Sequence, residues 1–381
     1  MTDHSYFMQR ALTLAEGGLY TASPNPRVGC VLVQQDDIIG EGFHLRSGEA
    51  HAEVHALRDA QQRGIDVVGA TAYVTLEPCS HTGKTPPCCD ALIRAQVGKV
   101  VVAMQDPNPL VAGAGIQRLR AAGIAVDVGV LAEQAEQLNK GFIKRMRQGL
   151  PWLRAKLAMS VDGRTAMASG ESQWITGPAA RSDVQRLRAQ SSAIISSVDT
   201  VLMDEASLNV RAEQLGMADQ SLVAAIVAQQ PLRVILDSTL RLSASAKLFS
   251  QPGPIVVICA QAKPPQRQAL EAAGAEVLQL AGEQGQVDLA AVMAELGRRA
   301  CNEVLLEAGA TLAGAFLQQG LLDEITVYMA PTLLGSEARP LFNLPLSSMS
   351  QQQRLQIQQI SPVGDDWRID ARPIVETNRK G

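Results

Sequence analysis

Four side chains near the start of the chain have the types and spacing of a zinc site that can do chemistry. His51 and Cys79 supply an imidazole and a thiol, and a further thiol follows at Cys88 or Cys89. A zinc ion held by three protein ligands keeps a fourth tetrahedral position open for water, unlike a closed structural site. Glu53 lies two residues beyond His51 and can reach that position without being a ligand, so the arrangement indicates hydrolysis.

The order of these residues matches the H-x-E…P-C-x-x-C pattern of zinc deaminases, except for one spacing. Here the pattern reads His51-Ala52-Glu53, then Pro78-Cys79, and eight residues separate Cys79 from Cys88 instead of two. In such a site zinc lowers the pKa of water to about 7, and the glutamate moves protons to the ring and to the departing ammonia. Spacing alone leaves both Cys88 and Cys89 as the third ligand.

Other residues around this motif admit two interpretations each. His51 and His55 are one helical turn apart, as in zinc proteases, but that motif needs a glutamate where Ala52 stands, and the thiols would have no role. His81 lies between the cysteines, either as a substrate contact or as a solvated loop residue. Asn25, between two prolines, either forms a plain turn or reads the donor and acceptor edges of a heterocycle.

Composition excludes several classes of protein. The 381 residues suit two domains, and 34 Lys+Arg against 38 Asp+Glu give a net charge of −4 without a dense basic run. A nucleic-acid partner is therefore not expected. No apolar run approaches the roughly 18–20 residues of a membrane span, and residues 1–19 lack the apolar block of a secretory signal. These features predict a cytoplasmic protein without a membrane partner. Three of the six cysteines lie within residues 79–89, which favours metal binding over disulfides.

Both halves of the chain alternate helices with strands, which predicts α/β domains with helices on the faces of a sheet. In the first half we expect helices at 3–17, 51–63, 88–95 and 115–122. We expect strands at 28–33, 72–76, 99–104 and 125–130, and a further strand that begins at residue 38. In the second half we expect strands at 153–159, 193–196, 233–237, 255–259, 303–307 and 325–330, and helices at 178–190, 289–299 and 311–319. Residues 212–230 and the glutamine-rich stretch 347–359 look less regular than the rest of the second half. The turn at 149–151 predicts a domain boundary, with domains at 1–148 and 149–381. All five histidines precede residue 82, so the second domain must act without an imidazole.

Longer motifs run along almost the whole chain and identify a family. They are residues 75–81 (TLEPCSH), 85–88 (TPPC), 106–109 (DPNP), 156–164 (KLAMSVDGR), 170–176 (GESQWIT), 201–204 (VLMD) and 307–312 (EAGATL). These motifs resemble the RibD family of bifunctional riboflavin-biosynthesis enzymes. The resemblance implies a cytidine-deaminase-like αβα sandwich followed by a dihydrofolate-reductase-like α/β domain. It also implies that Cys88, directly after two prolines, is the third zinc ligand.

The resemblance implies two consecutive reactions. The first domain, with one zinc ion per chain, would hydrolyse the 2-amino group of 2,5-diamino-6-(5-phospho-ribosylamino)pyrimidin-4(3H)-one. The second would use NADPH to reduce the ribosyl group to ribityl. It also implies a small phosphorylated pyrimidine as substrate and a homo-oligomer, a dimer or tetramer. The alternatives are a nucleic-acid or nucleoside deaminase with a C-terminal binding module, which the acidic excess of both halves disfavours, and a zinc-stabilised scaffold, which leaves Glu53 unexplained.

The second half lacks a G-x-G-x-x-G fingerprint, so a dinucleotide must be bound in another way. A glycine turn at 307–314 precedes a helix and offers N–H groups to a phosphate. The resemblance assigns NADPH contacts to Ala158, Trp174, Thr200, Asp204, Ser238, Gly309, Ala310, Thr311 and Leu312. It assigns substrate contacts to Asn25, Ser172, Arg188, Leu208, Arg211 and Glu307.

Three of the residues in the second half have an ordinary structural interpretation as well. Without the resemblance, Arg188 fits a solvated helix face, and Ala158 and Trp174 fit ordinary packing. Because no histidine is available there, Lys156, Asp204 and Glu307 are the titratable candidates for protonating the sugar ring oxygen or the imine nitrogen.

Overall fold

The computed structural model describes residues 3–109 and 111–374, and its contacts divide the chain into two units between Leu150 and Pro151. Helix α6 (Lys140–Gln148) ends at Gly149, whose φ of 72° is the left-handed conformation that commonly terminates helices. The outermost residues of both expected domains, 1–2 and 375–381, lie outside the described part of the chain. None of the described helices combines the length and the apolar character that a membrane crossing requires.

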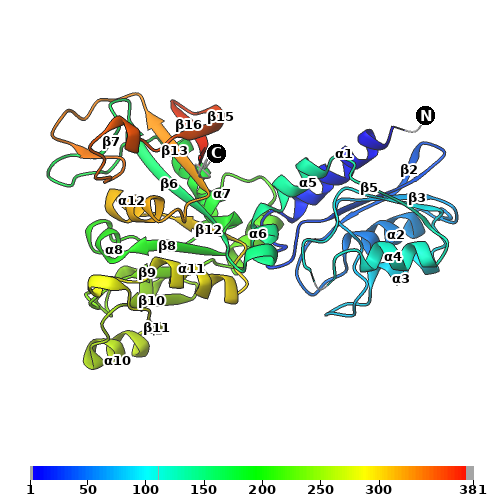
Figure 1. The fold of residues 1–381 in the computed structure, drawn as a ribbon, viewed down its shortest axis with the longest axis horizontal. Helices are drawn as coiled ribbons and strands as arrows, with labels where there is room; N and C mark the ends of the chain where they lie inside the picture. Colours follow the sequence, from blue (N-terminus) through cyan, green and yellow to red (C-terminus); the bar gives the residue numbers. More distant parts are fainter. Residues whose placement is uncertain (1–2, 110, 375–381) are drawn as a thin grey trace. The chain divides into compact units, whose positions relative to one another are not determined.

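The first unit is a sandwich of helices around a sheet (Figure 1). Within the described residues the strands run in the order β2-β1-β3-β4-β5. Their bounds are β1 (Gly29–Gln34), β2 (Asp37–Phe43), β3 (Thr71–Val74), β4 (Lys99–Val102) and β5 (Ala125–Val128). The helices are α1 (His4–Ala15), α2 (Ala52–Gln62), α3 (Cys88–Arg94), α4 (Ala114–Ala121), α5 (Ala132–Leu138) and α6, with a 3₁₀ turn at Glu16–Gly18.

Alternation along the strands builds two cores in the first unit, one on each face of the sheet. Val31 and Tyr73 pack with Phe7 of α1, whereas Leu32 and Val74 pack on the side of α2, α3 and α4. This is the period-two pattern of a sheet covered on both faces. The expected αβα arrangement is confirmed.

The second unit contains a larger mixed sheet, in the order β11-β10-β9-β8-β12-β6-β13-β16-β15. The strands are β6 (Trp152–Ser160), β8 (Ala193–Ser197), β9 (Leu232–Leu236), β10 (Ile255–Cys259), β11 (Ala275–Gln279), β12 (Glu303–Leu306), β13 (Glu324–Ala330), β15 (Leu355–Val363) and β16 (Asp366–Pro373). A small separate sheet pairs β7 (Arg164–Ala166) with β14 (Arg339–Pro340). The run from β11 to β13 is parallel, and β16 and β15 add an antiparallel hairpin.

The helices of this unit are α7 (Pro178–Gln190), α8 (Val198–Asp204), α9 (Gln220–Ala228), α10 (Pro264–Ala272), α11 (Leu289–Arg298) and α12 (Ala310–Gln318). Short 3₁₀ turns lie at Ala212–Gln214, Lys247–Ser250, Glu283–Gly285 and Met349–Gln351. The expectation that 212–230 is irregular is wrong, because Asp219 caps α9 through its side chain and Val223 and Ile226 bury its inner face. The same expectation fails for the end of 347–359, which begins the exposed strand β15.

Candidate functional site

Three residues of the first unit bring their ligand atoms into one small group. His51 directly precedes α2, Cys79 follows β3, and Cys88 is the first residue of α3. Their ligand atoms all lie within 4.8 Å of one another, and theirs is the one such group of His, Cys, Asp or Glu in the described residues. His51 Nδ1 lies 3.2 Å from Cys88 Sγ and 3.6 Å from Cys79 Sγ.

The donor set in this group suits a divalent zinc ion. A hydrogen bond with Cys88 lowers the pKa of the Cys79 thiol to about 4, and the same contact raises the pKa of Cys88. The Cys88 backbone N–H also donates to Cys79 Sγ at 3.3 Å. Without a cation, one thiol can be a thiolate only while the other stays protonated and donates to it. A divalent cation would stabilise both thiolates at once. The residues present therefore fit zinc.

The adjacent thiol of Cys89 lies in a different environment. Its Sγ donates to the carbonyls of Pro78 at 3.1 Å and Gly115 at 3.6 Å. Burial raises the pKa of Cys89 to about 12, so this side chain stays a protonated packing group. Cys88, not Cys89, faces His51.

Glu53 lies in the first turn of α2 and is only 3 % exposed. Burial raises the pKa of its carboxyl, and the neighbouring Cys79 raises it further. The structure thus places a buried carboxyl beside the three candidate ligands, where the sequence pattern predicted one.

Asn25 is held by a histidine that the sequence analysis did not single out. Its Nδ2 lies 3.0 Å from His44 Nε2, and His44 Nδ1 lies 3.1 Å from the Ala50 carbonyl. If Nδ1 donates to that carbonyl, Nε2 must accept from the amide, which fixes which way Asn25 points. The His44 ring also packs edge-on against His51, with centroids 5.1 Å apart. The available signal was a histidine at the end of the strand before the metal motif. His81, by contrast, is exposed.

The loop carrying Cys79 is held by the buried carboxylate of Glu77. Glu77 accepts four backbone hydrogen bonds, from the N–H groups of Asp106, Gly113, Gly115 and Ile116 at 2.8–3.2 Å. A Cβ on Gly115 would lie 2.0 Å from the Pro78 carbonyl, so only glycine permits this approach. Glu77 therefore fixes Asp106 and residues 113–116 against the metal loop.

In the second unit, the candidate residues follow or lie on neighbouring parallel strands. Lys156 and Ala158 lie on β6, Thr200 and Asp204 on α8 after β8, Ser238 after β9, and Glu307 with Gly309 after β12. These strands are adjacent in the order β9-β8-β12-β6. Ligands of α/β sheets bind outside the carboxyl ends of parallel strands, and these residues gather at that edge.

Gly309 caps α12, and Ala310, Thr311 and Leu312 form its first turn. A Cβ on Gly309 would meet no atom within 4 Å, so the space above this turn is open. Trp174 is 72 % exposed, in the loop before α7, and the Arg181 guanidinium lies 4.7 Å from its ring centroid. Ordinary packing does not account for an exposed tryptophan.

Arg188 and Glu307 form a bidentate ion pair, with N–O distances of 2.6 and 2.8 Å. Both side chains are little exposed, at 13 % and 11 %, so the solvated-face interpretation of Arg188 is wrong. Burial disfavours the charge on Glu307, but Arg188 holds the pKa of that carboxyl below its usual value. Burial lowers the pKa of the nearby Lys156 amine.

The segment with the other substrate candidates follows α8. Leu208 is buried with a φ of 53°, and Arg211 precedes the 3₁₀ turn Ala212–Gln214. Arg188 Nη1 donates to the carbonyl of Asn209 at 3.0 Å. The structure therefore brings Arg188, Glu307 and this segment together. Ser172 is partly buried in the Trp174 loop.

Each unit matches the model of a known protein family. Residues 1–104 match the cytidine and deoxycytidylate deaminase zinc-binding region, and residues 151–369 match the RibD C-terminal domain. The riboflavin biosynthesis protein RibD of Escherichia coli K12 is 51 % identical over 362 residues, which cover 95 % of this chain and 97 % of that protein. RibD of Haemophilus influenzae is 48 % identical, with 96 % of each chain covered.

Solved structures extend the likeness to the whole fold. Acinetobacter baumannii RibD has a TM-score of 0.87 at 48 % identity, with 97 % of this chain and 99 % of that chain covered. A Thermotoga maritima protein described as a diaminohydroxyphosphoribosylaminopyrimidine deaminase and 5-amino-6-(5-phosphoribosylamino)uracil reductase has a TM-score of 0.83 at 31 % identity, with the same coverage. The chain belongs to the RibD family of riboflavin biosynthesis proteins.

Proposed function

We infer that this chain is a bifunctional enzyme of riboflavin biosynthesis, a deaminase followed by a reductase. The observation that carries this conclusion is the group of His51, Cys79 and Cys88 beside Glu53, on a chain whose other unit matches the RibD reductase domain. The substrate is a small pyrimidine that carries a ribosylamine phosphate, as the description of the Thermotoga maritima relative indicates. A nucleic-acid deaminase with a C-terminal binding module would not account for the match of the second unit to the RibD C-terminal domain.

In the deamination step, His51, Cys79 and Cys88 would hold zinc, which would supply a Lewis acid and lower the pKa of water. Glu53 takes the proton from the attacking water and delivers protons to the ring nitrogen and the leaving amine. Asn25, oriented by His44, presents a fixed amide to the donor and acceptor edge of the pyrimidine. The product is the uracil derivative and ammonia.

In the reduction step, bound NADPH would be the source of the hydride that reduces the ribosyl carbon. The N–H groups of Gly309 to Leu312 at the start of α12 bind the cofactor's pyrophosphate, and Ala158, Trp174, Thr200, Asp204 and Ser238 line the rest of its site. Ser172, Leu208 and Arg211 contact the substrate. Lys156 and Asp204 are the candidate proton donors to the opening sugar.

Arg188 and Glu307 act together in this proposal. Glu307 and Asn209 take three of the five N–H groups of Arg188 in the described contacts, so at most two remain for the substrate phosphate. The paired Glu307 carboxylate keeps lone pairs that accept from substrate hydroxyls. Arg211 then provides the larger share of phosphate binding.

Two variants test whether the activities reside in separate units. Purified protein is supplied with the diaminopyrimidine substrate and, separately, with its deaminated product plus NADPH. Glu53→Ala is expected to retain zinc, lose ammonia release and still oxidise NADPH with the deaminated substrate. Glu307→Ala is expected to release ammonia from the diaminopyrimidine substrate but to oxidise no NADPH with the deaminated substrate. Retained ammonia production in Glu53→Ala would remove that residue from the mechanism.

We also propose a cytoplasmic location and a homo-oligomer, a dimer or tetramer. No two of the described cysteines are bonded as a disulfide, which agrees with a reducing compartment. On the edge strand β15, Leu355, Ile357 and Ile360 are 44 %, 58 % and 52 % exposed, and such an edge favours pairing with another chain. Light scattering of the native protein and of Ile357→Glu tests the assembly, which should dissociate in the variant.

A further inference from the structure

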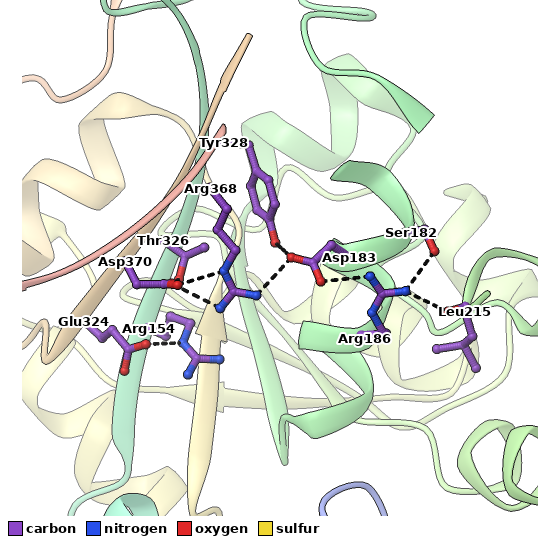
Figure 2. A network of polar contacts seen from close by, with 10 residues as sticks. All are labelled: Arg154, Ser182, Asp183, Arg186, Leu215, Glu324, Thr326, Tyr328, Arg368 and Asp370. Atoms are coloured by element: carbon purple, nitrogen blue, oxygen red, sulfur yellow. Dashed lines mark hydrogen bonds and ion pairs between the residues drawn. The ribbon is translucent and has the colours of Figure 1, made fainter. Parts of the chain in front are cut away.

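Helix α7 is fastened to the sheet of the second unit by a network centred on Asp183 (Figure 2). One carboxylate oxygen of Asp183 accepts from the Tyr328 hydroxyl at 2.6 Å and from Arg368 Nη1 at 2.9 Å. The other oxygen accepts from Arg186 Nη2 at 3.0 Å. Asp183 is only 9 % exposed, and burial disfavours its charge, yet these donors hold the pKa of its carboxyl below the usual value.

The sheet side of the network is itself held in place. Arg368 on β16 makes two further hydrogen bonds to Asp370, at 2.9 and 3.1 Å. Asp370 also accepts from the Thr326 hydroxyl of β13 at 2.6 Å. Because Thr326 pairs with Asp370 and Tyr328 pairs with Arg368 across the two strands, the donors to Asp183 come from a fixed part of the sheet.

The side chains of α7 that follow Asp183 hold residues 209–215 at three backbone atoms. Gln185 Oε1 accepts from the Arg211 N–H at 3.0 Å, and Arg188 Nη1 donates to the Asn209 carbonyl at 3.0 Å. Arg186 Nη1 donates to the Leu215 carbonyl at 3.2 Å. Arg186 is thus shared, with one nitrogen on Asp183 and the other on this segment (Figure 2).

We propose that Asp183 is a positioning residue for the phosphate-binding arginines of the reductase. It fixes α7 on β13 and β16 and orients Arg186, and α7 in turn fixes Arg188 and the backbone of Arg211. The inference rests on the proposed function, in which Arg188 and Arg211 contact the substrate phosphate. Asp183 itself acts through these residues and does not contact the reacting atoms. A displacement of about 1 Å at a binding group can cost about 10²-fold in rate.

The decisive variant is Asp183→Asn, which keeps the shape of the side chain but replaces one oxygen by an NH₂ group that faces a donor. The matched control is Glu324→Gln. Glu324 lies on β13 and is 6 % exposed. It accepts from Arg154 Nε at 3.0 Å (Figure 2) and from Trp152 Nε1 at 3.0 Å, and both donors lie on β6, not on α7. Both variants remove one buried carboxylate of the second unit, Asp183 on α7 and Glu324 on β13.

Asp183→Asn is expected to raise the KM for the deaminated, phosphorylated substrate about tenfold and to weaken inhibition by inorganic phosphate by a similar factor. The KM for NADPH and the deaminase activity should stay within about twofold of the wild type. Glu324→Gln should leave all KM values unchanged even if its melting temperature falls. An unchanged substrate KM in Asp183→Asn, or an equal rise for NADPH or in Glu324→Gln, overturns the proposal.

Two further measurements keep the proposal testable. If Asp183→Asn does not fold, Tyr328→Phe removes one hydrogen bond while both arginines remain, and it should raise the same KM about threefold; an unchanged KM counts against Asp183. Calorimetric binding of inorganic phosphate needs no turnover. A wild-type protein that binds phosphate, and binds it more weakly after Asp183→Asn, but never oxidises NADPH would overturn the proposed function and support the positioning role.

Discussion

The candidate metal site of the first unit and the candidate reductase site of the second are held together in opposite ways. The candidate metal ligands lie within residues 51–88, and the loop that carries Cys79 is fixed by backbone N–H groups that donate to Glu77. In the second unit, side chains far apart in sequence do this work. Arg188 pairs with Glu307 across 119 residues, and Tyr328 reaches Asp183 across 145. The first site can therefore be recognised from a local sequence motif, whereas the second depends on ion pairs and hydrogen bonds between residues far apart in the sequence.

Removing the metal should have the largest effect, because it should abolish the activity of the first site and leave that of the second unchanged. A strong chelator is expected to reduce ammonia release to the background rate, because in the proposed mechanism His51, Cys79 and Cys88 would hold the Lewis acid of the first step. Oxidation of NADPH with the deaminated substrate should continue, since that site contains none of these ligands. Both rates are measured on the same preparation, and added zinc should restore the first. Loss of both activities would contradict the separation of the sites.

Breaking the ion pair of the second site should have the next largest effect. Arg188→Met leaves Glu307 buried without its partner, which costs about 3–5 kcal/mol of stability. Thermal unfolding should show the loss in the reductase unit, while the deaminase activity of the folded protein persists. The double variant Arg188→Met/Glu307→Met should regain most of the stability but no reductase activity. A double variant no more stable than the single one would argue against the pair.

Changing the carboxylate that holds the metal loop should have a smaller effect. In Glu77→Gln an NH₂ group faces backbone N–H groups that now lack an acceptor, at a cost of about 2–3 kcal/mol. The first unit should melt earlier and bind zinc more weakly, which dialysis against a competing chelator measures. Glu133→Gln, an exposed change in the same unit, is the control and should alter neither quantity.

The smallest expected effect is on the pH dependence of stability. The folded pKa of Asp183 lies below its unfolded value of about 3.9, so its contribution is fully present above that pH. The contribution is lost as the pH falls through the folded pKa. Urea unfolding of the second unit should therefore show a shallower loss of stability below about pH 4 in Asp183→Asn than in the wild type. Identical acid limbs would mean that this carboxylate is not stabilised by its partners.

Much of the first site was predictable because its chemistry and its spacing lie in one short stretch. The alternation of helices and strands gave the α/β class in both units. Spacing alone left Cys88 and Cys89 open and the resemblance implied Cys88; the orientation of α3, which turns Cys88 and not Cys89 toward His51, supports that choice. His44 was missed because a single histidine at a strand end has no partner in the sequence pattern.

The second site was harder to predict from the sequence because its residues are far apart along the chain. Arg188 lies among other arginines of α7 and suggested a solvated face, since nothing nearby reveals Glu307 as its partner. Strand β15 was missed because its glutamines and exposed apolar residues show no one-sided burial. The network around Asp183 joins three elements whose contacts are set only by the assembled sheet.

The bonds that converge on Glu77 bear on the order in which the first unit is completed. They lie wholly within the polypeptide, so the loop beneath Cys79 takes its shape from the chain itself. Zinc fingers, in contrast, stay unfolded until the ion arrives. Because these hydrogen bonds involve no metal ion, we expect the first unit to fold before zinc binds and to keep its fold when a chelator removes the ion.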